Sequence, residues 1–320
     1  MDDHRPLVSV LMPTYNVAPF VEEAVRSILD QTYRNFELII VDDCSSDGTY
    51  EILKRLADLD HRIVLDRNDT NSKICITLNK AWSLAKGDFI ARMDGDDISM
   101  PDRLEVLLDF LNGHPDVDLV GSQVISINET GEVISQKQYL RTPDFIKRGN
   151  KYGPAVVHIW MARSKVYEAL NGYRNIPFAE DYDFLLRGET IGFRYANVEE
   201  YLYKVRIRSG NTGSANGLKQ RKTKDFVYTI NNSSEHIENV EELYRETIKS
   251  SDQELKQYEK AHKHLDIAVQ SRKKPGRLVF HTIIGMLESR YIFNYMLDAV
   301  KMRRLLSEEN RKVPRTKQNQ

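Results

Sequence analysis

The first 120 residues predict an α/β fold, with a mostly parallel central sheet flanked by helices. Three observations support this prediction. Short apolar, β-branched runs alternate along the chain with segments whose apolar residues recur at helical spacing. Each run is apolar at nearly every position, as expected for strands buried on both faces. Polar or acidic residues follow several of these runs directly, at the edge where such sheets bind ligands.

The predicted elements follow in regular order up to residue 120. Pro19 suits the first turn of a helix, Asp47 can cap the next helix, and Gly87 can end the third. We expect strands at residues 7–12, 36–41, 62–65, 89–93 and 117–120, and helices at residues 19–31, 49–59, 76–85 and 101–111.

The pattern changes after residue 121, where alternation predicts a hairpin instead of another strand and helix. A small, polar, glycine-rich stretch at residues 209–217 is expected to be mobile, and the sequence beyond it is helical and charged. Together these features predict an α/β domain over residues 1–217, a helical C-terminal extension over 218–310 and a disordered basic tail over 311–320. Within the second half of the domain we expect a hairpin at residues 123–137, helices at 164–170 and 181–189, and strands at 193–198 and 202–207.

Composition excludes several classes of protein. The 320 residues carry a net charge of −1, so the chain as a whole is not an electrostatic partner for nucleic acid. The two cysteines, Cys44 and Cys75, form no CxxC pair, which argues against a zinc site or a disulfide scaffold. The first residues are polar, and no run of about eighteen apolar residues occurs, so we expect a cytoplasmic chain without a membrane-spanning helix.

An acidic cluster, Asp94-Gly95-Asp96-Asp97, follows the strand expected at residues 89–93. Its carboxylates repel one another unless a positive charge neutralises them. A hard divalent cation, Mn²⁺ or Mg²⁺, can do this and can also bridge to phosphates. The alternative is an aspartate-rich turn that caps the next helix. The position at a strand end favours a ligand site.

A second acidic pair, Asp42-Asp43, follows the strand expected at residues 36–41. Asp42 could cap the turn at residues 44–46, or the pair could accept hydrogen bonds from a base or ribose. No glycine-rich loop bearing a lysine follows the first strand, and no GxGxxG occurs. P-loop and dinucleotide-binding proteins are therefore not expected.

Three segments in this order resemble the family 2 glycosyltransferases, which have the GT-A fold. They are VSVLMPTYNVAPFVEEAVRSILDQTYRNFELIIVDDCSSDGT (residues 8–49), ARMDGDDISMPDRLE (91–105) and AEDYDFLLR (179–187). The resemblance extends over residues 7–208 and implies a nucleotide-sugar half at about 1–121 and an acceptor half at about 122–217.

The resemblance also implies roles for individual residues. The acidic cluster would be the family's DxD motif, in which Asp94 contacts the ribose side and, with Asp96, holds the metal on the donor diphosphate. Asp181 would be the general base, with Glu180 beside it. Acids at a helix N-terminus are the alternative explanation for that pair. The base and ribose would be bound by Pro13, Thr14, Tyr15, Asp42 and Asp43.

Four further residues have less direct counterparts in the family. His158 and Trp160 would contact the acceptor or diphosphate, although a buried core histidine is an equal alternative. Arg206 would hold the diphosphate or simply end a strand; the family often has histidine where this chain has Arg208. Lys73 stands where many relatives have glycine in a turn, and it would reach a phosphate or lie in solvent.

Residues 272–304 combine basic, aromatic and aliphatic side chains, which suits a helix lying on an anionic membrane surface. A packed helical hairpin or a dimer interface is the alternative.

The expected function is an inverting, metal-dependent transfer of a hexose or N-acetylhexosamine from a UDP-sugar to a saccharide or lipid-linked saccharide. The process would be surface polysaccharide synthesis (O-antigen or capsule), with the enzyme peripheral on the cytoplasmic face of the inner membrane. A binding protein without turnover and a nucleotidyltransferase are the other hypotheses.

Overall fold

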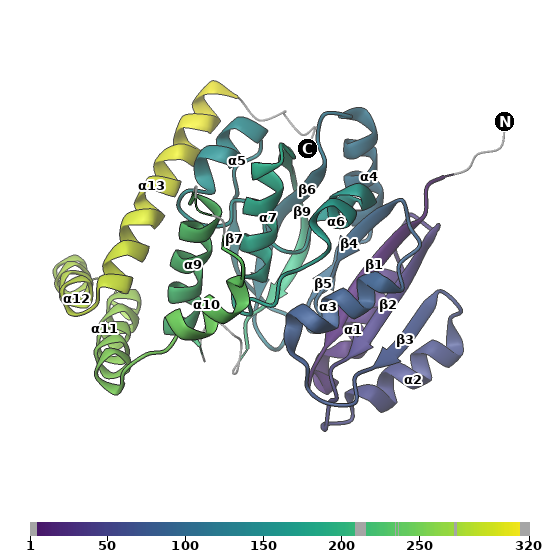
Figure 1. Ribbon diagram of the computed structural model, residues 1–320, viewed down its shortest axis with the longest axis horizontal. Coiled ribbons are helices and arrows are strands. Elements are labelled where there is room, and N and C mark those ends of the chain that lie inside the picture. The colour runs from purple at the N-terminus through teal and green to yellow at the C-terminus, as the bar shows by residue number, and fades with distance from the viewer. Residues whose placement is uncertain (1–4, 209–215, 234, 236, 272–273, 314–320) are drawn as a thin grey trace.

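A mixed sheet forms the centre of the molecule (Figure 1). The computed structural model describes residues 5–208, 216–233, 235, 237–271 and 274–313. Within them the sheet has nine strands in the order β3-β2-β1-β4-β8-β6-β9-β5, with β7 paired to β6. The predicted α/β class and the helical C-terminal extension are confirmed. The sheet, however, is mixed instead of mostly parallel, because antiparallel strands are inserted after β4.

The N-terminal half of the sheet is parallel and aligns the polar strand ends. In the register of the first two strands, Thr14 pairs with Asp42. The carboxyl ends of these strands therefore meet at one edge, as predicted. The parallel strands are β1 (Val8–Thr14), β2 (Phe36–Asp42), β3 (Ile63–Arg67) and β4 (Phe89–Arg92).

Two long strands carry the second half of the sheet and correct the sequence-based boundaries. The strands expected at residues 193–198 and 202–207 are one strand, β9 (Tyr195–Arg206), which pairs in parallel with β6 (Leu119–Ile127). The register shifts within this pairing, which lets polar residues stay inside one continuous strand. The expected boundary at 121/122 falls inside β6. The remaining strands are β5 (Ile98–Ser99), β7 (Val133–Lys137) and β8 (Met161–Arg163), all antiparallel to their neighbours.

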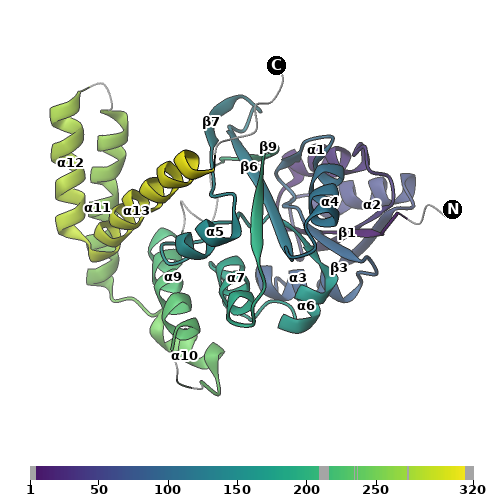
Figure 2. The same ribbon diagram turned by 90° about the horizontal axis from the view of Figure 1, so that it is seen from above.

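Helices cover both faces of the sheet (Figure 2). One buried apolar cluster lies under α1 (Ala18–Leu29), α2 (Thr49–Leu59) and α4 (Arg103–Gly113). A second cluster lies on the other face, under α3 (Lys73–Ser83), α5 (Pro143–Gly149), α6 (Ser164–Leu170) and α7 (Glu180–Thr190).

Two of the expected helix-end signals act differently from the prediction. The third helix ends at Ser83, and Gly87 lies beyond it, where a Cβ would be 2.6 Å from the Ser9 backbone nitrogen. Gly87 therefore permits a close approach of two backbones instead of ending a helix. Asp47 lies one residue before the N-cap Gly48, and its carboxylate accepts bonds from the Thr49 and Ala18 backbone amides. It thereby links the starts of α1 and α2.

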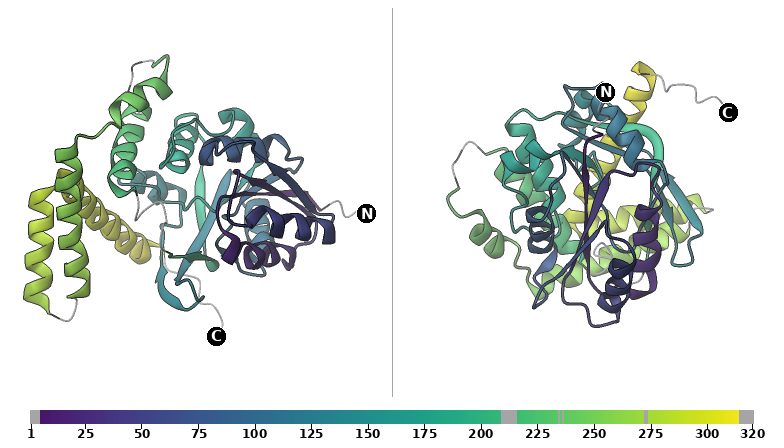
Figure 3. Two further views of the ribbon diagram at one scale, coloured as in Figure 1. Left: turned by 90° about the horizontal axis from the view of Figure 1, so that it is seen from below. Right: turned by 90° about the vertical axis from the view of Figure 1, so that its right-hand side faces the viewer.

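The C-terminal helices lie beyond α5 and α7, on the side of the sheet away from α1, α2 and α4. Figures 2 and 3 show α11 and α12 standing away from it as a pair, while α13 returns across α5. Residues 209–215 of the stretch expected to be mobile lie outside the described residues, whereas Gly217 begins a helix. Of the tail expected to be disordered, residues 311 and 312 are helical and 314–320 lie outside the described residues. The helices are α9 (Gly217–Asn231), α10 (Val240–Thr247), α11 (Asp252–Gln270), α12 (Pro275–Glu288) and α13 (Arg290–Lys312).

A buried glutamate attaches the last helix to the α/β domain. Glu309 of α13 has no exposed surface, and its carboxylate accepts hydrogen bonds from the backbone N–H groups of Arg141 and Thr142 at 2.9–3.0 Å. These amides belong to the two residues immediately before α5, and its N-cap residue Thr142 makes no side-chain cap bond to the helix. The last helix is thus bonded to the start of α5. No helix among the described residues is both long and apolar enough to cross a bilayer.

Glu189, in the last turn of α7, should make stability depend on pH. Burial raises its pKa from 4.5 to about 7, although the amide of Asn150 donates to it at 2.6 Å. Because the folded-state pKa is raised, its stabilising contribution is complete below about pH 4.5 and is lost as the pH rises through 7. Glu189→Gln, which can still accept the Asn150 bond, should raise the free energy of unfolding by about 1–3 kcal/mol at pH 8.

The same variant should change stability little at pH 4.5, and urea unfolding at the two pH values measures the difference. Glu168→Gln, an exposed glutamate on α6, is the control and should show no such pH dependence. An equal gain at both pH values for Glu189→Gln would contradict the assignment.

Candidate active site

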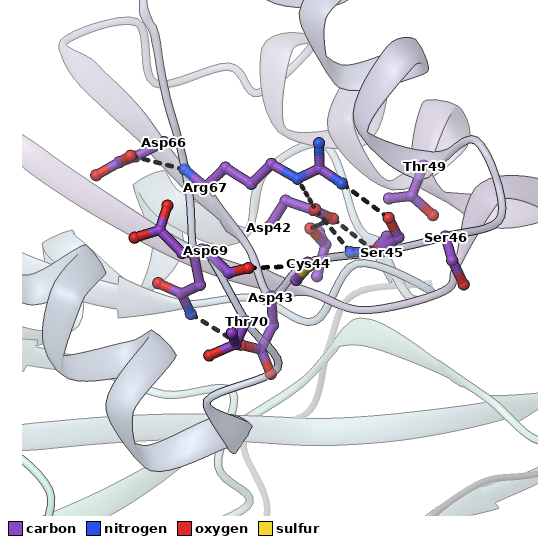
Figure 4. Close-up of polar contacts among 12 residues, drawn as sticks. Asp42, Asp43, Cys44, Ser45, Ser46, Thr49, Asp66, Arg67, Asp69 and Thr70 are labelled. Carbon is purple, nitrogen blue, oxygen red and sulfur yellow. Dashed lines mark hydrogen bonds and ion pairs between the residues drawn. The ribbon is translucent and has the colours of Figure 1, made fainter.

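Asp42 stabilises the turn that follows β2 (Figure 4). It is fully buried and accepts bonds from the backbone amide and hydroxyl of Ser45 at 2.9 and 2.5 Å. The guanidinium of Arg67 lies 3.3 Å away and stacks on the ring of Tyr50. The Asp42 carboxylate therefore bonds to groups within the protein, as in the turn-capping alternative. It does not face a site for the base or ribose, as the resemblance implied.

Asp43 anchors the loop that leads into α3. One of its oxygens accepts from the Asn68 amide and the Ser72 backbone at 2.8 and 2.6 Å, and the other accepts from the Lys73 backbone at 2.9 Å. This arrangement shapes the wall next to the strand ends. Lys73 has φ +70° and an exposed side chain, so the turn keeps the left-handed conformation that glycine favours, at a cost of about 1–3 kcal/mol. The lysine side chain lies in solvent.

The end of β1 touches the acidic turn. Pro13 and Thr14 are buried, whereas Tyr15 is 46 % exposed. A Cβ on Gly95 would lie 2.7 Å from the side chain of Thr14, so glycine at this position lets the acidic turn pack against the strand end. The three residues expected to wrap the base therefore border the acidic cluster, and Tyr15 is the one that offers an exposed ring.

Each carboxylate of the acidic turn has its own partner. Asp94 Oδ2 lies 2.8 Å from His158 Nε2, and Asp96 Oδ2 lies 2.7 Å from Arg208 Nε. Asp97 accepts the backbone N–H of Arg206 at 2.8 Å. The turn therefore holds three acids close together. Among the described residues, no hydrogen bond joins one of these carboxylates to another.

The electrostatics of this turn favour an added cation. Burial opposes ionisation of Asp94, but the charges of His158 and Arg92 outweigh it and hold its pKa well below the usual range. Burial and the neighbouring carboxylates instead raise the pKa values of Asp96 and Asp97. Negative charge at the turn is therefore incompletely neutralised by the protein.

The donor atoms fit a divalent ion that takes most of its ligands from a diphosphate. Asp94 Oδ1 is buried and has no hydrogen-bond partner among the described residues, with Arg92 Nε at 3.5 Å. The described residues contain no group of three or more His, Cys, Asp or Glu side chains placed to hold a metal alone. Mg²⁺ commonly binds through one or two carboxylates plus substrate phosphates, and Asp94 and Asp96 are the two that would hold it here.

His158 brings the acidic turn next to the start of α7. Its Nδ1 lies 3.8 Å from Asp181 Oδ2, while its Nε2 contacts Asp94. Burial disfavours the charged imidazole, but attraction to Asp94 prevails and raises the pKa of His158. The histidine belongs to the site and is not an isolated core residue.

The two acids at the start of α7 differ in their surroundings. Glu180 Oε1 lies 3.1 Å from a guanidinium nitrogen of buried Arg92, and burial raises the pKa of Glu180. The Asp181 side chain is 19 % exposed against 10 % for Glu180, and one oxygen of Asp181 accepts the Tyr182 backbone N–H. Asp181 is therefore the more exposed of these two carboxylates, whereas Glu180 is held in an ion pair with Arg92.

Two residues predicted as ligand contacts are structural instead. Trp160 is completely buried, donates to the Tyr167 hydroxyl at 3.1 Å and stacks on Phe184, so it is a core residue. Arg206 is 2 % exposed, and its guanidinium donates to the Asp96 carbonyl and to Glu23. Arg206 thus ties β9 to the acidic turn.

Sequence analysis missed two residues that hold the turn in place. Arg92 ends strand β4, and a charged residue inside an otherwise apolar strand was a usable signal. Tyr203, on β9, accepts the Asp94 backbone N–H through its hydroxyl at 3.0 Å. No local pattern marks that tyrosine, because the contact joins residues 109 positions apart.

Comparison by sequence identifies the relatives of this chain. Residues 9–182 match the model of the family described as Glycosyl transferase family 2. The chain is 38 % identical over 235 residues to the putative glycosyltransferase EpsE of Bacillus subtilis, covering 71 % of this chain and 80 % of that protein. It is 34 % identical over 215 residues to the O-antigen biosynthesis glycosyltransferase WbnJ of Escherichia coli, covering 64 % and 82 %.

Solved structures share the fold at low identity. S. aureus TarS 1–349, in complex with UDP-GlcNAc, aligns with a TM-score of 0.58 at 16 % identity and covers 95 % of this chain and 91 % of that chain. The mannosyltransferase PcManGT of Pyrobaculum calidifontis, in complex with GDP-Man and Mn²⁺, aligns with a TM-score of 0.57 at 16 % identity, covering 98 % and 82 %. The family match over more than half of the chain, with the GT-A-like fold, leads to one conclusion: the chain belongs to glycosyl transferase family 2 and is a transferase that uses nucleotide-sugar donors.

Proposed function

We propose that this enzyme transfers a hexose or N-acetylhexosamine from a UDP-sugar to a hydroxyl of a saccharide, carried on a lipid, during surface polysaccharide synthesis. The main support for this proposal is that His158 lies between Asp94 of the acidic turn and Asp181 of α7. This supports a diphosphate site at the acidic turn next to a general base at Asp181. The complex of TarS with UDP-GlcNAc supports the donor, and the O-antigen role in the name of WbnJ supports the process.

The reaction we propose is a single displacement with inversion. The acceptor hydroxyl oxygen forms a bond to the anomeric carbon as the bond from that carbon to the diphosphate oxygen breaks. The hydroxyl proton passes to the Asp181 carboxylate, which acts as general base. UDP leaves with the bonding electrons, so no nucleophile from the enzyme is required and an α-linked donor yields a β-linkage.

The fixed charges around the site suit these roles. Arg92 forms ion pairs with Glu180 and Asp94, so of the neighbouring acids Glu180 and Asp181 we assign Asp181 to the acceptor. A Mn²⁺ or Mg²⁺ ion held by Asp94 and Asp96 would stabilise the negative charge on the departing diphosphate. The Mn²⁺ in the PcManGT complex supports this cofactor.

A transfer assay over a donor panel tests the function. Purified enzyme with Mn²⁺ is incubated with UDP-glucose, UDP-galactose and UDP-N-acetylhexosamines, and UDP release is measured with and without acceptor saccharides. Slow hydrolysis of one donor, accelerated by an acceptor, is the expected result. Binding of UDP without UDP release from any donor would favour a binding protein without turnover.

A lipid-linked acceptor would place the enzyme at a membrane, and α12 offers the surface for it. In the segment expected to bind membrane, α13 packs through buried Tyr291, Ile292 and Leu305, in agreement with the packed-helix alternative, although it also exposes four apolar side chains (Phe293, Tyr295, Leu297 and Val300, 39–48 % exposed). In contrast, α12 exposes an apolar stripe beside exposed Lys274 and Arg277; Arg272 and Lys273 lie outside the described residues. The stripe consists of Val279, Phe280, Ile283 and Leu287, which are 51–82 % exposed. An apolar stripe with basic flanks matches an anionic bilayer surface.

Liposome flotation should show this association. Binding to phosphatidylglycerol vesicles is expected at low salt and should fall as salt screens the basic residues. Phe280→Ser with Leu287→Ser should lower the partition coefficient at least tenfold, since each side chain contributes about 1.5–3 kcal/mol when buried. Leu59→Ser, at a 74 % exposed leucine on α2, is the matched control. Absence of binding at low salt would refute the proposal, as would a dimer that the double variant dissociates.

A further inference from the structure

The ion pair between Asp96 and Arg208 occupies the carboxylate that we assign to the metal. Arg208 Nε lies 2.7 Å from Asp96 Oδ2, and the two side chains are only 22 % and 17 % exposed. The Arg208 guanidinium also lies over the ring of Phe20, 5.9 Å from its centroid. The pair is therefore an ordered part of the site and not a contact between freely moving surface groups.

This partner cannot be removed by deprotonation. A guanidinium keeps its charge at any pH the protein survives, so a divalent ion approaching Asp96 meets a fixed positive charge. Repulsion between like charges is strong in a partly buried site, where water screens poorly. The metal and Arg208 therefore compete for Asp96 unless an anion joins them.

The donor diphosphate is such an anion. Arginine binds phosphate oxygens with two parallel hydrogen bonds, which offers Arg208 a partner to replace Asp96. With the diphosphate present, both cations can be accommodated. Arg208 binds the phosphates, and the divalent ion is shared between the phosphates and Asp96.

We propose that Arg208 makes metal binding at Asp96 conditional on the donor diphosphate. Without donor, Arg208 neutralises Asp96 and keeps the divalent ion weakly bound. When the diphosphate arrives, Arg208 transfers to its oxygens and Asp96 is released to the metal. This inference rests on the proposed function, because it concerns the cation and the diphosphate of that reaction.

Two binding measurements on one variant test the proposal. Free Mn²⁺ is followed by electron paramagnetic resonance during titration of nucleotide-free enzyme, and UDP binding is measured by calorimetry at saturating Mn²⁺. Arg208→Gln should bind Mn²⁺ alone about tenfold more tightly and UDP with Mn²⁺ about tenfold more weakly, within the roughly 5- to 150-fold range of coupled sites. Arg208→Lys keeps the charge and should bind Mn²⁺ alone as the parent does.

The control is Arg148→Gln, which removes an arginine paired with Glu308 at 2.7 Å, far from the acidic turn; neither affinity should change. Melting curves show whether each variant is folded. Unchanged or weaker binding of Mn²⁺ alone by folded Arg208→Gln would overturn the proposal. A failure of the proposed function can be told apart from a failure of this inference. In the first case the parent releases no UDP from any donor, while the Mn²⁺ titration still measures the competition of Mn²⁺ and Arg208 for Asp96.

Discussion

Asp181→Asn should lose about a hundred- to ten-thousand-fold in turnover, the usual cost of removing a positioned general base. Asparagine keeps the shape and can still accept the Tyr182 backbone N–H, which Asp181 accepts at 2.7 Å. We propose the donor site at the acidic turn and not at Asp181, so the affinity for UDP-sugar with Mn²⁺ should stay near the parent value. Initial rates and calorimetry on the one variant separate the two effects.

The matched control for this substitution is Asp144→Asn. Asp144 is an exposed acid in the first turn of α5, as Asp181 is in the first turn of α7. If Asp181 only interacted with the helix dipole, both variants would lose about 0.3–1 kcal/mol of stability and keep their activity. A fully active Asp181→Asn enzyme would remove the residue from the mechanism. Glu180 would then be the next candidate, although its pairing with Arg92 argues against it.

Chelation of divalent metal should reduce the transfer rate by about a thousandfold, since a metal that stabilises a leaving group contributes several kcal/mol to the transition state. Added Mn²⁺ or Mg²⁺ should restore the rate. Asp96→Ala should make UDP binding insensitive to Mn²⁺ while the fold persists, because Asp96 is the second carboxylate of the proposed metal pair.

Asp102→Ala serves as the control for this prediction, because Asp102 is an exposed acid close in sequence to the acidic turn. It should keep both the rate and the metal dependence of UDP binding. Full activity in chelated enzyme would refute metal dependence. It would leave Arg208 and His158 as the cations that balance the departing diphosphate.

Local patterns were sufficient for the parallel half of the sheet. The strands ending near Thr14, Asp42 and Arg92 are short apolar runs, and burial on both faces makes such runs visible in sequence. The acidic turn was located for the same reason, since carboxylates that follow buried strands stand out. What those carboxylates contact was not predictable, because His158, Tyr203 and Arg208 approach from distant parts of the chain.

The second half of the sheet was harder to predict, because the extent of its strands depends on hydrogen bonding to neighbouring strands and not on an apolar run in the sequence. Residues 199–201 are polar and suggested a break, yet they lie inside β9 because β6 continues beside them with shifted registers. Trp160 illustrates the same limit at the level of one side chain. Its neighbours in sequence suggested a ligand site, while packing against Phe184 and Tyr167 places it in the core.

The attachment of Glu309 to the start of α5 has a consequence for synthesis of the protein. The amides of Arg141 and Thr142, just before α5, find no partner within the helix, and their acceptor is a residue 167 positions beyond Thr142. A growing chain folds from its N-terminus as it leaves the ribosome, so these two amides lack their carboxylate partner until the final helix has been translated. A product that stops before residue 309 would leave both amides without that carboxylate, and the start of α5 would be held less firmly in it.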